Sequence, residues 1–321
     1  MSPEVRRTEI EEELKRALPA CGEVIRLQPL IKGHGHQSFV LETSSKTTLL
    51  LKIALRNEQL GKMKSLRVAL ELAAEHQITA PKLLYFSEGT ASFAGRPWLV
   101  QEFLMGQDGE EALPGLSDFQ RAAFFRDFGR AVARLHAVDA GYFTEDLASS
   151  ERVETWASLV ESRLDRLTNT HRQAGLLPRQ SIESAGAAIL SAARAVSPGL
   201  RPSLVHRDLY LPNTLVSAGR FRCLLDFEHA RSADPVTDFV KLKMWVLEQV
   251  PGSESEFCLG YGVNPLLTEN GRTRHRLALG LELLAGLLYW QTTGQPEMLA
   301  DYQRRFEHWL NQSPEREDEH E

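Results

Sequence analysis

The pattern of hydrophobic and polar positions changes in character near residue 105 of this 321-residue chain. Before that point, apolar residues gather in short runs, as in EVIRLQPLIKGHGHQSFVLET (23–43) and KTTLLLKIAL (46–55). Such runs, bounded by turn residues, predict β-strands, and the two serines between them predict a hairpin. Two more strands are predicted in KLLYFSEG (82–89) and RPWLVQEFL (96–104).

Two helices are predicted in the same part of the chain. RTEIEEELKRAL (7–18) has apolar residues at helical spacing and charged partners four positions apart, which is typical of an amphipathic surface helix. EQLGKMKSLRVALELAAEH (58–76) repeats this spacing and ends before Pro81. Residues 1–105 are therefore expected to form a small sheet with one interposed helix, preceded by the N-terminal helix.

The rest of the chain is mainly helical in pattern. Ser117 and Asp118 are favoured helix-capping residues, and apolar positions then recur three and four residues apart as far as Ala140. Further helices are predicted at 151–168, 180–196, 237–249, 272–293 and 297–311. A short β-hairpin is predicted in TLVSAGRFRCLLDF (214–227).

These patterns predict an α+β fold class with two lobes. The β-rich N-lobe is expected to span residues 1–105 and the mainly helical C-lobe residues 106–313, followed by an acidic, disordered tail at 314–321. With 42% hydrophobic residues, the chain can bury a core of the size that two lobes need. The tail holds five acidic residues and one arginine, so it contributes most of the formal net charge of −6.

Composition excludes two classes of partner and favours one compartment. No cluster of lysine and arginine with interleaved aromatic residues is present, so we expect no nucleic-acid ligand. The longest apolar run, LALGLELLAGLLYW (277–290), is too short to span a bilayer and contains Glu282, which favours a buried helix over a membrane segment. The first twenty residues lack the apolar stretch of a secretory signal, so a cytoplasmic location is expected. The oligomeric state is not indicated by the sequence.

The segment SLVHRDLYLPNTLV (203–216) carries the clearest chemical signal. Its residues from His206 to Asn213 match H-R-D-L-x-x-x-N, the catalytic-loop pattern of protein kinases. Phosphoryl transfer requires a group that orients the attacking hydroxyl, and oxygen ligands for the magnesium ions that bridge the nucleotide phosphates. Asp208 is the candidate catalytic base. Asn213, and Asp226 in CLLDF, are the candidate Mg2+ ligands because amide and carboxylate oxygens suit this ion.

A simpler interpretation is that Asp208 only caps a turn. The combination of residues argues against it, because Asn213 and Asp226 stand at the two ends of the predicted apolar hairpin. Three polar side chains suited to this chemistry are thereby expected to meet at one place. His206 is interpreted as a structural residue that holds the loop by hydrogen bonds.

A second candidate segment, LIKGHGHQSFVLE (30–42), is expected to hold the nucleotide. Gly33, Gly35 and Ser38 nearly match the glycine-rich strand-turn-strand of kinases, with Ser38 at the position of the third glycine. Glycines let backbone N–H groups approach phosphate closely, although an ordinary β-turn is the alternative. Lys52 lies within an otherwise apolar strand, where a phosphate is a natural partner for its charge. The alternative for Lys52 is a solvent-facing position on an edge strand.

With these motifs, the chain resembles the aminoglycoside phosphotransferase and choline-kinase-like family over residues 22–310. The stretches that carry the resemblance are LVHRDLYLPNTLV, CLLDFEHA, DPVTDF, ITAPKLLYF, WLVQEFLMG and VARLHAVDA. The resemblance implies a bilobal protein-kinase-like fold and a magnesium-dependent phosphoryl transfer from ATP or GTP. It also implies that Gln101, Glu102 and Phe103 form the hinge whose backbone receives the nucleobase, and that Asp238 braces the catalytic loop.

In one respect the sequence departs from the family pattern. The family places the glutamate that pairs with the lysine where this chain has Leu66 or Arg67. Glu58, which opens the predicted helix, and Glu71, one turn beyond Arg67, are the available replacements. Of the two, Glu71 is the preferred candidate partner of Lys52 at the nucleotide site.

The segment after Asp226 indicates the class of acceptor. Protein kinases carry a long activation segment between D-F-G and A-P-E. Here Asp238 follows Asp226 by only twelve residues and no A-P-E is present, which leaves no room for a peptide platform. A hydroxyl of a small molecule is therefore the expected acceptor, with an aminoglycoside or another antibiotic, as in a resistance enzyme, as the first candidate. The alternatives are a metabolic kinase of the choline, homoserine, sugar or nucleoside type and a catalytically silent kinase-like nucleotide-binding protein.

Acidic residues in the predicted helices bear on that choice. Several could receive a polycationic aminoglycoside, although solvated helix faces explain most of them equally well. These residues are Glu161, Asp165, Glu269, Glu282 and Asp301. Glu282 stands out because it lies inside an apolar helix, where an arginine such as Arg276 is the alternative partner.

Overall fold

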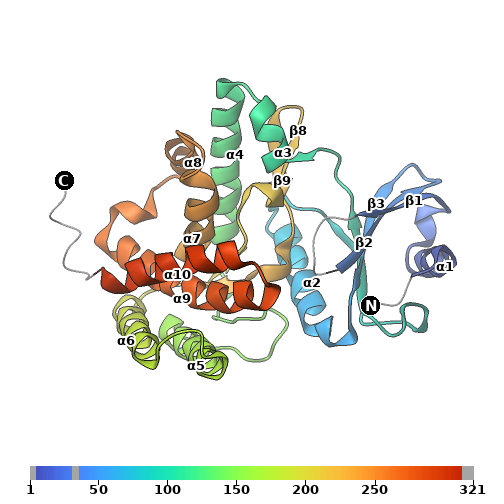
Figure 1. The fold of residues 1–321 in the computed structure, drawn as a ribbon. Coiled ribbons are helices and arrows are strands. Elements are labelled where there is room, and N and C mark those ends of the chain that lie inside the picture. The colour runs from blue at the N-terminus through green and yellow to red at the C-terminus, as the bar shows by residue number, and fades with distance from the viewer. Residues whose placement is uncertain (1–4, 31–35, 313–321) are drawn as a thin grey trace.

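The computed structural model describes residues 5–30 and 36–312, and its two parts differ in architecture (Figure 1). The N-terminal part is built on a five-stranded antiparallel sheet with the order β1-β2-β3-β5-β4. The strands are β1 (Val24–Leu30), β2 (His36–Thr43), β3 (Thr48–Ala54), β4 (Leu83–Ser87) and β5 (Trp98–Glu102). The predicted hairpin is confirmed as the β2–β3 turn, across which Val40 pairs with Leu50.

Two helices cover opposite faces of this sheet (Figure 1). On one face, α1 (Arg7–Ala17) buries Ile10 and Leu14 against the strands. On the other face, α2 (Leu60–Glu75) buries Met63 and other apolar residues. Both helices lie where the hydrophobic spacing predicts them, so this part of the chain is organised as its pattern indicates.

The C-terminal part is mainly helical. Its helices are α3 (Gly109–Ala112), α4 (Asp118–His136), α5 (Trp156–Ala174), α6 (Arg179–Val196), α7 (Asp238–Leu242), α8 (Ser253–Tyr261), α9 (Glu269–Thr293) and α10 (Pro296–Asn311). Short strands form two small sheets, β6-β8-β9 and β10-β7. They are β6 (Gln107–Asp108), β7 (Ser203–Val205), β8 (Thr214–Ser217), β9 (Arg220–Leu224) and β10 (Arg231–Ala233). A strand-rich part beside a helical part confirms the predicted α+β class.

Differences from the predicted helices have local causes. α5 begins five residues later than expected because Thr155 caps it, and its side-chain oxygen accepts a hydrogen bond from the Ser158 N–H. Gly175, with a left-handed φ of 62°, ends the same helix. α8 is absent from the sequence prediction because its apolar residues do not gather on one side of the helix. α7 continues as a π-helical turn over Lys243–Leu247.

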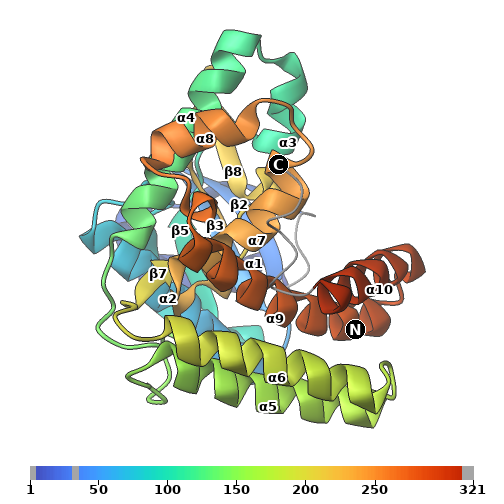
Figure 2. The ribbon, with the colours of Figure 1, turned by 90° about the vertical axis from the view of Figure 1, so that its left-hand side faces the viewer.

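The central hydrophobic core joins the two parts and fixes the position of the candidate site. Buried residues of α2, β5, α4, α7 and α8 form one cluster that also contains Leu209 and Phe227. Leu209 follows Asp208 and Phe227 follows Asp226, so each candidate acid is next to a residue anchored in this core. A second cluster lies among α5, α6, α9 and α10, where Figure 2 shows α5 and α6 side by side. Among the described residues, no helix has both the length and the apolar character needed to cross a bilayer.

Candidate active site

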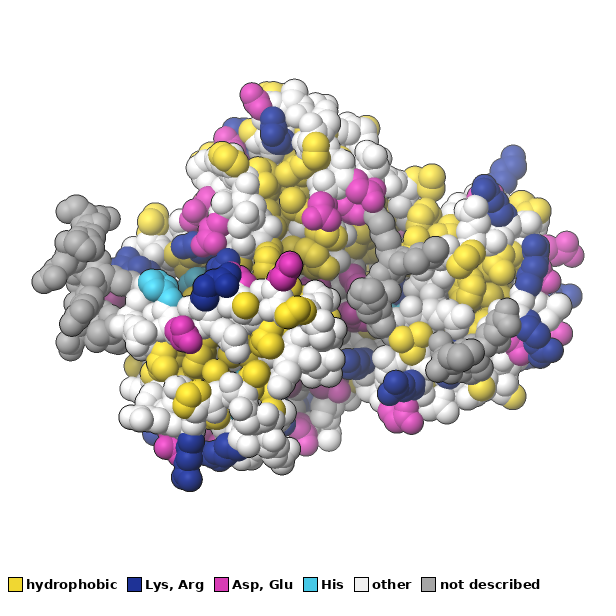
Figure 3. Space-filling model, viewed as in Figure 1, with side chains coloured by type: hydrophobic (Ala, Val, Ile, Leu, Met, Phe, Trp, Pro, Cys, Tyr) yellow, Lys and Arg dark blue, Asp and Glu magenta, His cyan; other side chains and the backbone are white. Residues whose placement is uncertain are grey.

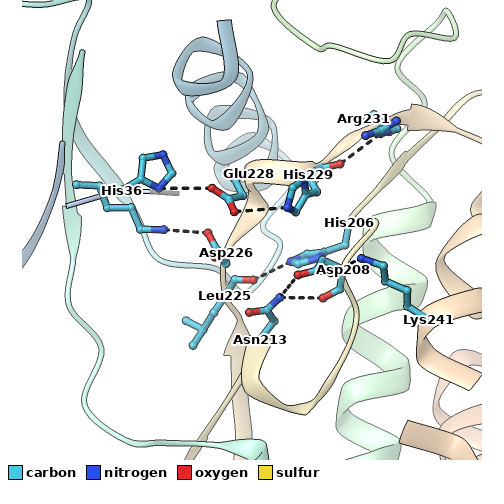
Figure 4. A network of polar contacts seen from close by, with 11 residues as sticks. His36, His206, Asp208, Asn213, Leu225, Asp226, Glu228, His229, Arg231 and Lys241 are labelled. Atoms are coloured by element: carbon cyan, nitrogen blue, oxygen red, sulfur yellow. Dashed lines mark hydrogen bonds and ion pairs between the residues drawn. The ribbon is translucent and has the colours of Figure 1, made fainter. Parts of the chain in front are cut away.

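The predicted catalytic loop follows β7 and places Asp208 between two hydrogen-bond donors (Figure 4). Nδ2 of Asn213 donates to Oδ2 of Asp208 (2.8 Å) and to the Asp208 carbonyl oxygen (2.9 Å). Nζ of Lys241, on α7, donates to Oδ1 of Asp208 (2.7 Å). Both carboxylate oxygens are thus held, while 17% of the Asp208 side chain remains exposed. The structure brings Asp208 and Asn213 together, and Lys241 joins them.

The backbone of the loop is braced by Asp238, the first residue of α7. Its carboxylate accepts from the N–H groups of His206 (2.8 Å) and Arg207 (2.6 Å), and Nε2 of His136 donates to its Oδ2 (2.9 Å). Burial would raise the pKa of Asp238, but the hydrogen bond and charge of His136 and the contacts with His206 outweigh burial and lower the pKa. The implied role of Asp238 as a brace is confirmed.

His206 ties the catalytic loop to the strand that leads to Asp226. Its imidazole is fully buried, and Nε2 donates to the Leu225 carbonyl oxygen (2.7 Å). Arg207 and Asp226 both have left-handed backbone conformations, with φ of 69° and 58°. Such values are uncommon for residues other than glycine and persist where the surroundings fix them, often at functional sites. The chain thus turns sharply at Arg207, next to Asp208, and at Asp226.

Asp226 also contacts the N-terminal sheet, through Lys52. Nζ of Lys52 donates to Oδ1 of Asp226 (2.9 Å), and only 12% of the Lys52 side chain is exposed, which excludes a solvent-facing edge position. Ser38 on β2 pairs directly with Lys52 on β3. Burial would raise the pKa of Asp226, but the Lys52 ammonium lowers it below its ordinary value. Lys52 therefore lies beside Ser38 within the sheet and contacts Asp226 where the two parts join, whereas Gly33 and Gly35 lie outside the described residues.

A third acidic side chain, Glu228, lies beside Asp226 (Figure 4). Its Oε2 is 3.4 Å from Nδ1 of His36, and its Oε1 is 3.4 Å from Nε2 of His229. Burial, followed by the negative charge of Asp226, raises the pKa of Glu228 to about 7. Burial lowers the pKa of His36 and of His229 to about 4. At neutral pH the imidazoles of His36 and His229 are therefore uncharged. Of these three side chains, Glu228 is the one whose charge changes near neutral pH.

The structure does not bring Glu71 to Lys52, so the predicted pairing is wrong. Glu71 is 55% exposed on the solvent side of α2, and its Oε1 lies 3.8 Å from Nε of Arg67. A cavity of about 440 Å³ lies there, lined by Glu71, Arg67 and residues 82–86. Glu71 lies on the solvent side because the opposite side of α2 carries apolar residues, which are buried against the central core. Glu58, the other candidate, is exposed as well.

The predicted hinge ends β5 and leads into the C-terminal part. Gln101 is buried within the sheet. The N–H of Glu102 donates to the Lys82 carbonyl oxygen (2.9 Å), and the N–H of Phe103 donates to the Thr48 carbonyl oxygen (3.1 Å). Both N–H groups are therefore already bonded within the N-terminal part. Contact between the hinge and a nucleobase stays a prediction.

Asn213 and Asp226 offer oxygen atoms of the kind that Mg2+ prefers. Asn213 uses Nδ2 to bond Asp208, which leaves its carbonyl oxygen Oδ1 as the atom suited to a cation. In the part of the chain that the structure describes, no group of three or more His, Cys, Asp and Glu side chains forms a ready metal site. Two protein ligands fit an ion whose remaining ligands are nucleotide phosphates and water.

Three of the acidic helix residues are already paired with arginines. Oε2 of Glu282 lies 3.6 Å from a terminal nitrogen of Arg207, and both side chains are nearly buried, at 11% and 8% exposure. The partner of Glu282 is therefore Arg207 and not Arg276, whose guanidinium donates to backbone carbonyls near the end of α10. The other paired residues are Glu161 with Arg194, and Asp301 with Arg304 and Arg305. The Glu282 contact anchors the catalytic loop to α9.

Negative charge gathers instead around Tyr210, within the catalytic loop. Burial raises the pKa of Tyr210 to about 12, and the charges of Asp208, Asp226, Glu110 and Glu228 add to this effect. Glu110 belongs to α3. Figure 3 shows acidic side chains over α3 and hydrophobic side chains gathered in a recess between α4 and α10. This face of the molecule thus combines an acidic edge with an apolar recess.

Two residues of the candidate site, Lys241 and Glu228, are not identified from the sequence. Lys241 in DPVTDFVKLK has the pattern of an ordinary helix lysine. Its one signal is that it follows Asp238 by three positions, which places both on one helix face. Glu228 stands in CLLDFEHA, two residues after Asp226, and this spacing alone does not distinguish it from a surface acid.

The chain is similar to one protein family and to several solved structures. The family described as "Phosphotransferase enzyme family" matches residues 26–278. No curated protein matches the chain in sequence. One similar structure is a thermostable mutant of aminoglycoside phosphotransferase APH(4)-Ia in ternary complex with AMP-PNP and hygromycin B. It is 18% identical with a TM-score of 0.71, and the match covers 94% of this chain and 98% of that one.

Two further structures extend this likeness. The gentamicin–APH(2")-IIa complex is 18% identical with a TM-score of 0.67, and the match covers 97% of this chain and 98% of that one. Macrolide 2'-phosphotransferase MphH from Brachybacterium faecium is 19% identical with a TM-score of 0.62, with coverage of 95% and 98%. At these identities the likeness concerns the fold, and it confirms the bilobal kinase-like architecture.

Proposed function

Because the chain belongs to the phosphotransferase enzyme family, we propose that it transfers the γ-phosphoryl group of ATP or GTP to a hydroxyl of a small molecule, with Mg2+ as cofactor. The observation that carries this proposal is the geometry of Asp208. Its carboxylate is held by Asn213 and Lys241 and remains partly exposed. A fixed carboxylate of this kind can orient a hydroxyl for in-line attack and accept its proton.

The path from Asp226 to Asp238 supports a small acceptor. These twelve residues pass through β10 into α7, and most of their side chains are buried. A segment that is built into the fold is not available as a platform for a peptide. The acceptor must therefore approach Asp208 as a compact molecule.

The remaining residues are assigned to the nucleotide. Lys52 and Ser38, together with the loop that contains Gly33 and Gly35, hold the triphosphate at the N-lobe (1–105). Gln101, Glu102 and Phe103 contact the nucleobase, and the C-lobe (106–313) holds the acceptor. Asn213 and Asp226 would hold Mg2+, which when bound offsets the negative charge of the phosphates.

An aminoglycoside is the first candidate acceptor. The exposed acidic side chains of α3, Glu110 and Glu111, favour a polycation, because like charges gathered at one edge attract the opposite charge. Two of the similar structures are complexes with hygromycin B and with gentamicin. A macrolide is the second candidate, favoured by the apolar recess between α4 and α10 and by the likeness to a macrolide phosphotransferase.

A panel of hydroxyl-bearing compounds tests this proposal. Aminoglycosides, macrolides, choline, homoserine, sugars and nucleosides are each incubated with the protein, MgCl2 and either ATP or GTP. Mass spectrometry then detects acceptors that have gained a phosphoryl group, and an Asp208→Asn variant serves as the control. We expect one acceptor class to be phosphorylated by the wild-type protein only. Tight nucleotide binding with neither product nor magnesium-dependent nucleotide hydrolysis would contradict the proposal and indicate a silent binding protein.

A further inference from the structure

Lys241 is the described side chain whose cation directly contacts the carboxylate of Asp208. It lies on α7, whose first residue, Asp238, holds the backbone of the catalytic loop. One short helix therefore supplies the brace for the loop and a cation for its carboxylate. The Lys241 side chain is 29% exposed and the Asp208 side chain 17%, so the pair is shielded from water while a ligand can still reach it.

The two donors to Asp208 occupy different oxygens. Lys241 bonds Oδ1 at 2.7 Å, and Asn213 bonds Oδ2 at 2.8 Å. A carboxylate bonded at both oxygens cannot rotate freely, yet each oxygen keeps a further lone pair. Asp208 can therefore accept one more hydrogen bond, from an acceptor hydroxyl, in a fixed direction. Removal of Lys241 would leave Oδ1 without this support.

The charges around the Lys241–Asp208 pair indicate a second, electrostatic role for Lys241. Besides burial, the negative charges of Asp208, Asp226, Glu110 and Glu228 raise the pKa of Tyr210, which lies two residues after Asp208. An incoming γ-phosphoryl group adds further negative charge. Lys52 is bound to Asp226. The ammonium of Lys241 is thus the cation placed to offset the charge on Asp208 itself.

We propose that Lys241 is a positioning residue, which fixes the Asp208 carboxylate toward the acceptor hydroxyl and offsets its charge. The inference rests on the proposed phosphotransferase reaction. In that reaction the acceptor oxygen forms a bond to the γ-phosphorus, and the bond from this phosphorus to the bridging oxygen of the departing nucleoside diphosphate breaks. The hydroxyl proton moves to Asp208. Lys241 exchanges no atom with the substrates.

Steady-state kinetics of two variants at this position test the proposal. Lys241→Met removes the charge and keeps the chain length, whereas Lys241→Arg keeps a cationic donor. For Lys241→Met we expect kcat to fall by about 10²-fold, the size of effect that loss of alignment causes, with KM for the nucleotide changed less than about twofold. Lys241→Arg should recover part of kcat. The melting temperature should stay within about 2 °C of wild type in both.

Lys64→Met is the matched control. Lys64 is 31% exposed and pairs with Glu88 at 2.8 Å on the N-terminal part, so this change removes a comparable ion pair away from Asp208. It should leave kcat unchanged. A wild-type kcat for Lys241→Met, or equal losses in both lysine variants, would overturn the inference while leaving the proposed function intact. An inactive wild-type protein would refute the proposed function first.

A double-mutant cycle shows whether Lys241 acts through Asp208. Turnover is measured for Asp208→Asn and for Asp208→Asn combined with Lys241→Met, under single-turnover conditions if the rates are low. If Lys241 works by positioning the carboxylate, its removal should cost less than about threefold once that carboxylate is gone. A further loss of about 10²-fold in the double variant would show independent action and contradict the positioning role.

Discussion

The proposed acceptor side and the proposed nucleotide side of the candidate active site are held in different ways. On the acceptor side, Asp208 is fixed by Asn213 and Lys241, and its loop is bonded to the buried Asp238. On the nucleotide side, Lys52 contacts Asp226, a residue 174 positions away in the chain. The first side is held by several hydrogen bonds within the C-terminal part, some of them buried, whereas the second side depends on contacts between the two lobes, among them the ion pair of Lys52 with Asp226.

This difference indicates which half of the site is complete before ligands bind. Buried hydrogen bonds to charged groups are strong and specific, so the catalytic loop is preformed by the fold. On the nucleotide side, Glu71 does not pair with Lys52 as expected. The ammonium of Lys52 is paired with Asp226 instead. We therefore expect substitutions on the acceptor side to change chemistry or stability, and substitutions on the nucleotide side to change affinity.

The largest effect is expected from Asp208→Asn. The amide cannot accept the hydroxyl proton, so turnover should fall by about 10²–10⁴-fold, the usual contribution of a general base. Nucleotide affinity, measured by isothermal titration calorimetry, should stay within about twofold of wild type. Near-normal turnover would contradict the role of Asp208 as general base. It would also contradict the expectation that substitutions on the acceptor side change the chemistry.

Asp238→Asn should destabilise the protein by about 3 kcal/mol, because it replaces a buried carboxylate that accepts three hydrogen bonds. The folded-state pKa of Asp238 is lowered, so its stabilisation is fully present above the unfolded pKa of about 4. It is lost as the pH falls through that value toward the folded pKa. Urea unfolding at pH 7 and at pH 3 should therefore show a smaller difference between variant and wild type at pH 3. A constant difference would contradict a role for the carboxylate charge.

Asp226→Ala tests the nucleotide side. Because it removes a candidate metal ligand, magnesium-dependent nucleotide affinity should fall by about tenfold or more. Lys52→Met is the control, since it breaks the same ion pair but keeps the carboxylate. Calorimetric titration with and without MgCl2 should show that the Lys52 variant retains a magnesium effect and the Asp226 variant does not. The same magnesium effect in both would contradict the assignment of Asp226.

Glu71→Gln should have the smallest effect. Glu71 lies on the solvent side of α2 beside Arg67, and exposed ion pairs contribute about 0–1 kcal/mol. We expect nucleotide affinity and turnover to change by less than about twofold. A loss of affinity comparable to that of Lys52→Met would contradict this expectation. It would indicate that Glu71 pairs with Lys52 when the nucleotide is bound, as the family pattern implies.

Much of the fold and half of the site follow from local sequence pattern. The strands of the five-stranded sheet, the β8–β9 hairpin, α1, α2 and most helices of the C-terminal part lie where hydrophobic spacing places them. Asp208 and Asn213 are five residues apart, so a short motif is sufficient to predict their contact. Asp238 follows from the family resemblance, and its hydrogen bonds confirm it.

The remainder depends on packing between distant segments. The contact of Lys52 with Asp226 joins two lobes, and that of Lys241 with Asp208 joins a helix to a loop, so neither has a local signature. The prediction for Glu71 is wrong because the apolar side of α2 packs against the central core. This packing sets the rotation of the helix about its own axis. One residue of error along a helix turns a side chain by about 100°.

In the proposed reaction, the ion pair between Lys52 and Asp226 also competes with the nucleotide phosphates and with the metal ion. Under the proposed function, Lys52 must leave Asp226 to meet a phosphate, and Asp226 must leave Lys52 to meet the metal ion. Apparent affinity for either ligand alone is reduced by the fraction of molecules in which the pair is closed. Because opening the pair for one ligand frees the partner residue for the other, the two bind with positive and reciprocal coupling. This ion pair between the lobes thereby favours the metal–nucleotide complex over its separate components.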